Sequence, residues 1–557
     1  MGKRINMKKK IVAIFLMFTV VLSSSCNVTY ELKKSFGKTV NIQDVFEETC
    51  AYGNTELIDE LLDTGEITQE TLNNGLGRAT GNMCDIYLTM THLIQKGADA
   101  NTGELLWQAA YNDLIFQLAA LLTDKKLDIN KKSMGKYSAL YMAMENHRGG
   151  MDYTAYNNSK MLLDKGAEIY PEMFQNEGDS KEPQYSYNQL SSSVSSARLL
   201  VTEYLKKKDD IDIPEALKYA LCGESAKCIQ SIREGKEEIT ESDQTIIQEY
   251  VCCYGTPEEY EELYKKYGEK YKISYPRIAE CGNTEMLRYL FKKNEVKIDY
   301  KKVGQLDLSL DKYEECLDYA ALWGHYDTCK FLCESGMRSA KAIGCGYSAL
   351  SYAISSGNVK LIKYLYNYIK SYEGKITEEY LGDTIELCEK KWGSYMPLDD
   401  KRKEIYDFLF SKGHNFSDFQ MIYSDEATNE YLIEHGMKVS DENINYMASH
   451  NQKKALEAAF KKGYHPVDET LRNAVVHGSS DTVKLILDNG AEIPDDILNS
   501  AVLASKATVK VLIDAGANKD LKLKSITLIT GDTELGDYDL KDCYKMNARE
   551  DLLELLD

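Results

Sequence analysis

Residues 478–490 read Gly-Ser-Ser-Asp-Thr-Val-Lys-Leu-Ile-Leu-Asp-Asn-Gly, and this stretch recurs along the chain of 557 residues. Residues 504–516 read Ala-Ser-Lys-Ala-Thr-Val-Lys-Val-Leu-Ile-Asp-Ala-Gly, and residues 324–336 read Gly-His-Tyr-Asp-Thr-Cys-Lys-Phe-Leu-Cys-Glu-Ser-Gly. Residues 53–65 fit the same frame. The closing glycines at 463, 490 and 516 are 27 and 26 residues apart. A segment that returns at a period of this size indicates an array of stacked repeats.

The letters of one unit predict an amphipathic helix that ends at its glycine. Val483, Ile486 and Leu487 fall on one helical face, and charged residues occupy the opposite face. Gly490 follows the last apolar residue, where helices commonly end in a left-handed conformation that glycine adopts without a Cβ clash. Asn294 takes the equivalent place in another unit, so we expect it to adopt this conformation. A shorter helix with small residues precedes each turn, and its alanines let neighbouring helices approach closely.

Two of these shorter helices carry a resemblance to a known family. Residues 138–143 read Ser-Ala-Leu-Tyr-Met-Ala, residues 348–353 read Ser-Ala-Leu-Ser-Tyr-Ala, and Gly324-His325 opens a following helix. These units resemble ankyrin repeats, whose consensus begins Thr-Pro-Leu-His-x-Ala. The resemblance runs from about Ile42 to about Lys519 and implies an all-α fold, an ankyrin-repeat α-solenoid of stacked helix pairs.

The spacing of the units departs from the family pattern. Several units are shorter than the usual 33 residues, so we expect few or short β-hairpin fingers. Only the stretches before Ser138 and Ser348 have room for a finger. The chain then divides into an export signal peptide (1–25), a tether (26–41), N-terminal ankyrin-like repeats (42–175), a polar insertion or linker (176–196), central and C-terminal ankyrin-like repeats with an irregular insertion around 366–403 (197–519) and a C-terminal cap (520–557). Whether the solenoid continues across 176–196 stays open.

The first residues have the order of an export signal. A basic start is followed by an apolar run from Ile11 to Leu22 and by three serines before Cys26. This order resembles a bacterial lipoprotein-type signal peptide, which implies lipidation of Cys26 and a place in the cell envelope as a membrane-anchored lipoprotein. Ser23 stands where that family usually has leucine, so cleavage after a serine and secretion is the alternative. Met1 and Met7 both remain candidate starts.

The composition excludes one class of partner. The chain has 67 lysines and arginines against 88 aspartates and glutamates, which gives a net charge of −21. This negative charge disfavours binding to the negatively charged backbone of a nucleic acid. Hydrophobic residues make up 43% and charged residues 28%, as in ordinary globular proteins. We therefore expect a folded protein whose partner is another protein, with a basic partner favoured and a monomer as the default state.

The cysteines and glycines do not predict a catalytic or metal site. His325, Cys329 and Cys333 are spaced like zinc ligands on one helical face, but both cysteines occupy positions that are valine, leucine or isoleucine in other units. We expect them to pack in the core as small apolar residues. No phosphate-binding loop, His-Glu-x-x-His motif or nucleophile elbow is present in the sequence. The prediction is no enzyme, no cofactor and no metal.

The resemblance places a binding surface on the concave side, where the first helices and the turns expose side chains. The predicted surface consists of Tyr111, Met142, Tyr319, Leu322, Trp323, Tyr352, Asn473 and His477. Aromatic anchors of this kind dominate interface energies. We interpret the chain as a non-catalytic protein-interaction module. The alternative is an enzyme or toxin-related effector with its activity in the irregular 366–403 region or in the C-terminal tail.

Overall fold

The computed structural model describes residues 40–80, 85–112, 114–132, 137–145, 153–168, 251–252, 255–267, 273–298, 316–339, 348–381, 398–414, 425–531 and 533–557. The expected signal peptide, Cys26, the insertion at 176–196 and residues 382–397 of the irregular region lie outside this set. So do residues 133–136 and 340–347, where fingers were expected before Ser138 and Ser348.

The chain divides into two compact units, and unit 1 is discontinuous in sequence. Unit 1 combines the described residues 40–80 with residues 448–451 and the described part of 466–557. Unit 2 consists of residues 85–447 and 452–465. Most of the described chain is helical, and a two-stranded antiparallel sheet lies in the tail.

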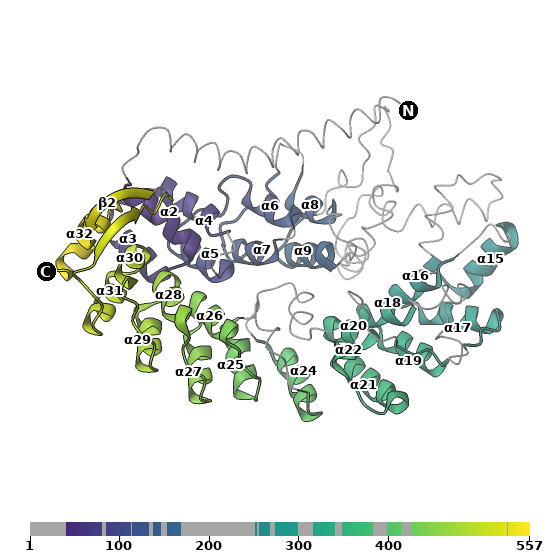
Figure 1. The fold of residues 1–557 in the computed structure, drawn as a ribbon. Helices are drawn as coiled ribbons and strands as arrows, with labels where there is room; N and C mark the ends of the chain where they lie inside the picture. The colour runs from purple at the N-terminus through teal and green to yellow at the C-terminus, as the bar shows by residue number, and fades with distance from the viewer. Residues whose placement is uncertain are drawn as a thin grey trace, which may run out of the picture. The chain divides into compact units, whose positions relative to one another are not determined.

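Unit 2 contains paired helices that pack in two rows. Its described helices are α5 (Ile86–Gln95), α6 (Leu105–Tyr111), α7 (Ile115–Leu121), α8 (Ala139–Glu145), α9 (Tyr153–Asp164), α15 (Pro257–Tyr267), α16 (Tyr275–Glu280), α17 (Thr284–Lys293), α18 (Cys316–Leu322), α19 (Tyr326–Glu334), α20 (Ala349–Ser356), α21 (Val359–Glu373), α22 (Glu378–Leu381), α24 (Asp400–Ser411), α25 (Glu426–Glu434) and α27 (Lys453–Lys461), with α26 (Asp441–Ser449) crossing the boundary between units. The first helices α16, α18 and α20 pack on one another, and the second helices α17, α19 and α21 form the other row (Figure 1). Helix pairs are therefore stacked in the part of this unit that runs from α16 to α21.

Unit 1 joins one N-terminal segment to the C-terminal repeats and a cap. It contains α2 (Ile42–Tyr52), α3 (Thr55–Asp63), α4 (Gln69–Arg78), α28 (Asp468–His477), α29 (Ser480–Asp488), α30 (Ile497–Ser500), η6 (Ala501–Leu503), α31 (Lys506–Asp514), β1 (Lys522–Thr527), β2 (Thr533–Asp539), α32 (Leu540–Met546) and η7 (Glu550–Leu555). The alternating stretch after Lys519 forms β1, which pairs with β2, and η7 packs on α31. Ile526 of β1, together with Tyr544 and Leu552, lies in the core of this tail.

The glycine prediction is confirmed at the helix ends. Gly490 has φ of +93° and Gly516 has φ of +102°, so both adopt the left-handed conformation. The prediction for Asn294 is wrong, because its φ is −94° and the left-handed residue is Glu295, with φ of +47°. Helix α17 has ten residues where α29 has nine, which moves the turn by one position.

Two glycines with the same backbone conformation give a test of how neighbouring turns fit. Gly65 and Gly282 both have φ of +73°, but a Cβ at Gly65 meets nothing within 4 Å, whereas a Cβ at Gly282 comes within 2.6 Å of Nδ1 of His325. We expect Gly65→Ala to cost about 1 kcal/mol of unfolding free energy through the left-handed backbone. Gly282→Ala should cost about 1–2 kcal/mol more, because the imidazole must shift from its hydrogen bond. Urea unfolding followed by circular dichroism measures both, and equal losses would contradict the expectation.

No helix within the described ranges combines the length and the apolar character needed to span a bilayer.

Candidate functional site

Neighbouring repeats are held together by hydrogen bonds between their turns. In unit 2, Nδ2 of Asn358 donates to the carbonyl of Gly324 at 2.9 Å, and Nδ2 of Asn283 donates to the carbonyl of Gly255 at 3.0 Å. Nε2 of His325 is hydrogen-bonded to the carbonyl of Glu280 at 2.9 Å. The asparagine side chains also cap the helices that follow them, since Asn283 and Asn358 each accept a backbone N–H. These bonds fix each turn relative to the preceding one.

The predicted binding residues divide into half-buried and buried side chains. Tyr319 and Leu322 on α18, Trp323 after it and Tyr352 on α20 are half-buried. Tyr111 is also half-buried, and its ring stacks on Trp107 with the centroids 5.6 Å apart. Met142 is only 6% exposed and packs inside its helix pair. Asn473 and His477 belong to α28 of unit 1 and are half-buried.

His477 lies against the N-terminal segment. Its Nδ1 is hydrogen-bonded to the carbonyl of Tyr52 at 2.8 Å, and the two rings are 5.4 Å apart, centroid to centroid. Asn54, two residues beyond Tyr52, is fully buried and donates to the carbonyls of Val476 at 3.2 Å and Leu503 at 3.0 Å. The turn between α2 and α3 therefore contacts two turns of the C-terminal repeats, which are more than 400 residues away in sequence.

Glu56 supplies hydrogen-bond acceptors to the same two turns. Its carboxylate accepts from the backbone N–H and the hydroxyl of Ser480, each at 2.7 Å, at the start of α29. It also accepts from the hydroxyl of Ser505, the N-cap of α31, at 2.7 Å. The first turn of a helix carries unpaired N–H groups and a partial positive charge, so a carboxylate is favoured at this position.

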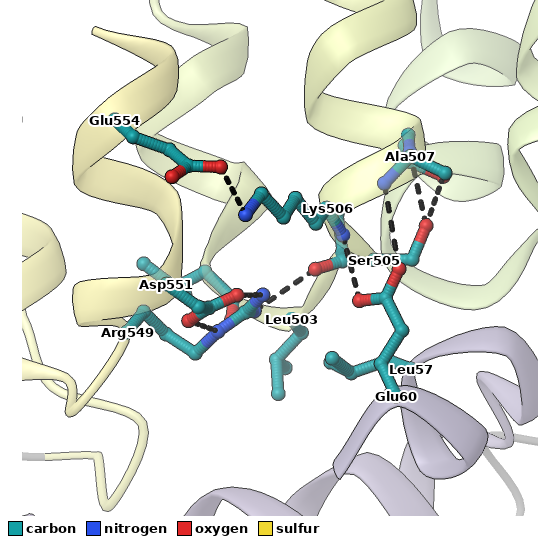
Figure 2. Close-up of polar contacts among 12 residues, drawn as sticks. Leu57, Glu60, Leu503, Ser505, Lys506, Ala507, Arg549, Asp551 and Glu554 are labelled. Atoms are coloured by element: carbon teal, nitrogen blue, oxygen red, sulfur yellow. Dashed lines mark hydrogen bonds and ion pairs between the residues drawn. The ribbon is translucent and has the colours of Figure 1, made fainter. Parts of the chain in front are cut away.

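Glu60, one helical turn further along α3, binds the start of α31. Its carboxylate accepts from the backbone N–H of Lys506 at 2.8 Å and from that of Ala507 at 3.5 Å (Figure 2). Burial raises the pKa of Glu60, while these two N–H donors and the nearby Arg549 oppose that shift. Because its pKa is raised, Glu60 takes up a proton at a higher pH than a free glutamate does.

The cap holds the same turn from its other side. Arg549 is fully buried, and its guanidinium donates to the carbonyls of Val502 and Ala504 while binding both carboxylate oxygens of Asp551 at 2.9 Å. Lys506 forms an ion pair with Glu554 of η7 (Figure 2). The turn at 502–507 is therefore fixed between the N-terminal segment and the cap.

Two cysteines of α19 are core residues. Cys329 and Cys333 are free and buried, which confirms the packing prediction. Burial raises the pKa of the Cys329 thiol well above its usual value and that of Cys333 to about 12, so both thiols resist ionisation at neutral pH. Cys281 is disulfide-bonded. Within the described ranges, no group of three or more His, Cys, Asp and Glu side chains is arranged to hold a metal ion.

One segment of the chain matches a known protein family. Residues 317–365 match the family model for ankyrin repeats (many copies). The matched segment runs from α18 into α21 and contains Tyr319, Leu322, Trp323 and Tyr352. This match supports an ankyrin-repeat protein, as the resemblance predicted. No curated protein matches the chain.

Sequence reasoning did not find Asn54, Glu56, Glu60 or Arg549. Asn54 and Glu56 stand in the motif Asn-Thr-Glu, which occurs again at residues 283–285, so nothing in the letters marks the first copy as different. Only the fold, which brings residues 40–80 beside the C-terminal repeats, distinguishes them.

Proposed function

We propose that this protein is a non-catalytic protein-binding module, an ankyrin solenoid that binds another protein through its concave face. Ankyrin repeats generally mediate protein–protein interaction, and the match over residues 317–365 is the observation that carries the proposal. In this view Tyr319, Leu322, Trp323 and Tyr352 form the central anchors. The turn-to-turn hydrogen bonds support this reading, because a surface that is rigid before binding loses little conformational entropy on association.

The proposal includes the location of the protein and the charge of its preferred partner. The basic start, the apolar run and the serines before Cys26 favour export, with a lipid on Cys26 that holds the protein at the cell envelope; secretion remains the alternative. The net charge of −21 favours a basic protein as the partner through electrostatic steering. A monomer is the proposed state.

Removal of the central aromatic anchors should abolish partner capture. A photo-crosslinking residue in place of Tyr352, in an otherwise native chain, identifies the species held at this surface. We expect the variant Tyr319→Ala with Trp323→Ala to weaken binding by between about 30-fold and about 1,000-fold, and the crosslink with it, since each anchor contributes on the order of 2 kcal/mol and 1.4 kcal/mol is tenfold. The matched control is Tyr326→Ala, a tyrosine on the second helix of the same pair, which should leave the crosslink unchanged. A full crosslink yield in the folded double variant would refute the proposed surface.

The proposed anchor predicts a specific mass. Protein extracted from membranes should begin at Cys26 and carry acyl chains, whereas Cys26→Ala should yield no lipidated form. Intact mass spectrometry of both proteins checks this expectation. A mature protein that begins at a serine or at an unmodified Cys26 would establish secretion instead, and the partner would then be sought in the medium.

A further inference from the structure

The N-terminal segment covers part of the proposed binding surface. His477, one of the predicted binding residues, is hydrogen-bonded to the carbonyl of Tyr52 and lies against its ring. Asn473 precedes His477 by one helical turn on the same face of α28. An incoming protein that uses this end of α28 would therefore meet residues of the chain itself.

We propose that residues 40–80 form an intramolecular latch, which is seated on the turns 476–480 and 503–507 and must lift before a partner can reach His477. We call residues 40–80 the latch and the two turns the seat. This inference rests on the proposed binding function. A partner that binds only the open form opens the latch by shifting the population towards that form.

The latch has a core of its own. Helix α2 packs along α4, and the backbone of α4 comes so close that a Cβ at Gly75 would lie 2.7 Å from Sγ of Cys50 and 2.9 Å from the ring of Phe46. Val45, Phe46, Leu72 and Leu76 are buried. The helices of the latch therefore bury apolar surface against one another, and lifting the latch leaves that packing in place.

The hydrogen bonds between latch and seat are formed by a few side chains around the α2–α3 turn. Neighbouring repeats in unit 2 pack along whole helices, as α18 does on α16 and α20. The latch contacts the seat through the α2–α3 turn and through α3. Asn54, Glu56 and Glu60 form hydrogen bonds to the seat. His477 of the seat is hydrogen-bonded to the carbonyl of Tyr52 and lies against its ring. Such a contact exchanges hydrogen bonds with water when it opens, so its free energy is far smaller than that of a core interface.

The charges of latch and seat are complementary. The latch presents two carboxylates four residues apart, and the seat presents the N-terminal turns of α29 and α31. Arg549 of the tail, outside the seat, also interacts electrostatically with Glu60. Reversing the charge of both glutamates should therefore convert attraction into repulsion without touching the apolar core of either side.

Hydrogen exchange on the intact free protein tests the latch. In Glu56→Lys with Glu60→Lys, we expect peptides covering 476–480 and 503–507 to exchange at least about tenfold faster, while 349–373 and the core helices of the latch stay unchanged. The matched control is Glu66→Lys with Glu70→Lys, which has the same spacing and charge change on exposed side chains, and Glu70 holds in α4 the position that Glu56 holds in α3. The control should exchange like the unmodified protein.

Three results would overturn the proposal. Unchanged exchange in the seat would show that Glu56 and Glu60 do not hold the latch on the seat. Loss of protection throughout 468–514 would show that the latch is a permanent part of the core of these repeats. Protection that depends on protein concentration, with a doubled mass in light scattering, would mean that a second copy supplies the latch. Since all three are read on the free protein, they leave the proposed function standing.

The gating step has its own readout. A photo-crosslinker at position 477 should capture the partner more efficiently in the charge-reversed variant than in the control. Equal capture with an open seat would refute gating, whereas loss of the crosslink from position 352 in the unmodified chain would instead refute the proposed function.

Discussion

Replacing Arg549 with methionine is expected to cost about 3–5 kcal/mol of unfolding free energy. The guanidinium is fully buried and donates to two backbone carbonyls, those of Val502 and Ala504. Hydrogen bonds from a charged donor contribute about 1.5–3 kcal/mol each, and a buried carbonyl left without its donor also loses its former solvation. Asp551 is 44% exposed, so water can solvate it after the change.

The matched control is another arginine–aspartate pair in the same unit. Arg472 binds Asp496 at 2.5 Å, with side chains 31% and 55% exposed. This hydrogen bond lowers the pKa of Asp496. Arg472→Met should nevertheless cost less than about 1 kcal/mol, because exposed ion pairs gain little over their hydration. Urea unfolding followed by circular dichroism compares the two variants, and similar midpoints would contradict the structural role given to Arg549.

Local letters predicted the parts of the fold that depend on local physics. The apolar spacing of Val483 and Ile486 and the closing Gly490 describe one helix and its end, and the structure has both. Cys329 could be assigned to the core because an aligned unit has valine there. Asn294 failed because one extra residue in α17 moved the left-handed position to Glu295, and a helix length is decided by packing as well as by its end residue.

The contacts between residues 40–80 and the C-terminal repeats could not be predicted from local sequence. Asn54 and Asn283 follow a glycine and precede Thr-Glu, so their sequence environments are alike. Asn283 contacts a turn 28 residues earlier in the sequence, whereas Asn54 contacts turns 422 and 449 residues later. The sequence of a repeat determines which turn surfaces fit together, but it does not determine which of the other repeats a given turn contacts. That choice depends on where the whole chain leads each copy.

Replacing Asn54 with aspartate should destabilise the contact between latch and seat by about 3 kcal/mol. The new carboxylate keeps the acceptor that caps Leu57 at the start of α3. It lacks the amide N–H groups that reach the carbonyls of Val476 and Leu503, so a buried negative charge faces two carbonyl oxygens. Burying such a charge without a hydrogen-bond donor is strongly unfavourable. We expect the contact between residues 40–80 and the two turns to open and let water reach the carboxylate, which limits the loss.

The equivalent change in another repeat provides the control for this expectation. Asn358 caps α21 and donates to a single carbonyl, that of Gly324, from a half-buried position. Water can solvate part of a carboxylate there, so Asn358→Asp should cost about 1 kcal/mol. Hydrogen exchange measures both locally: peptides 476–480 and 503–507 should lose protection in Asn54→Asp, and peptide 349–373 should change only slightly in Asn358→Asp. Equal losses of protection in the two variants would contradict the expectation that the two buried hydrogen bonds of Asn54 hold residues 40–80 against the C-terminal repeats.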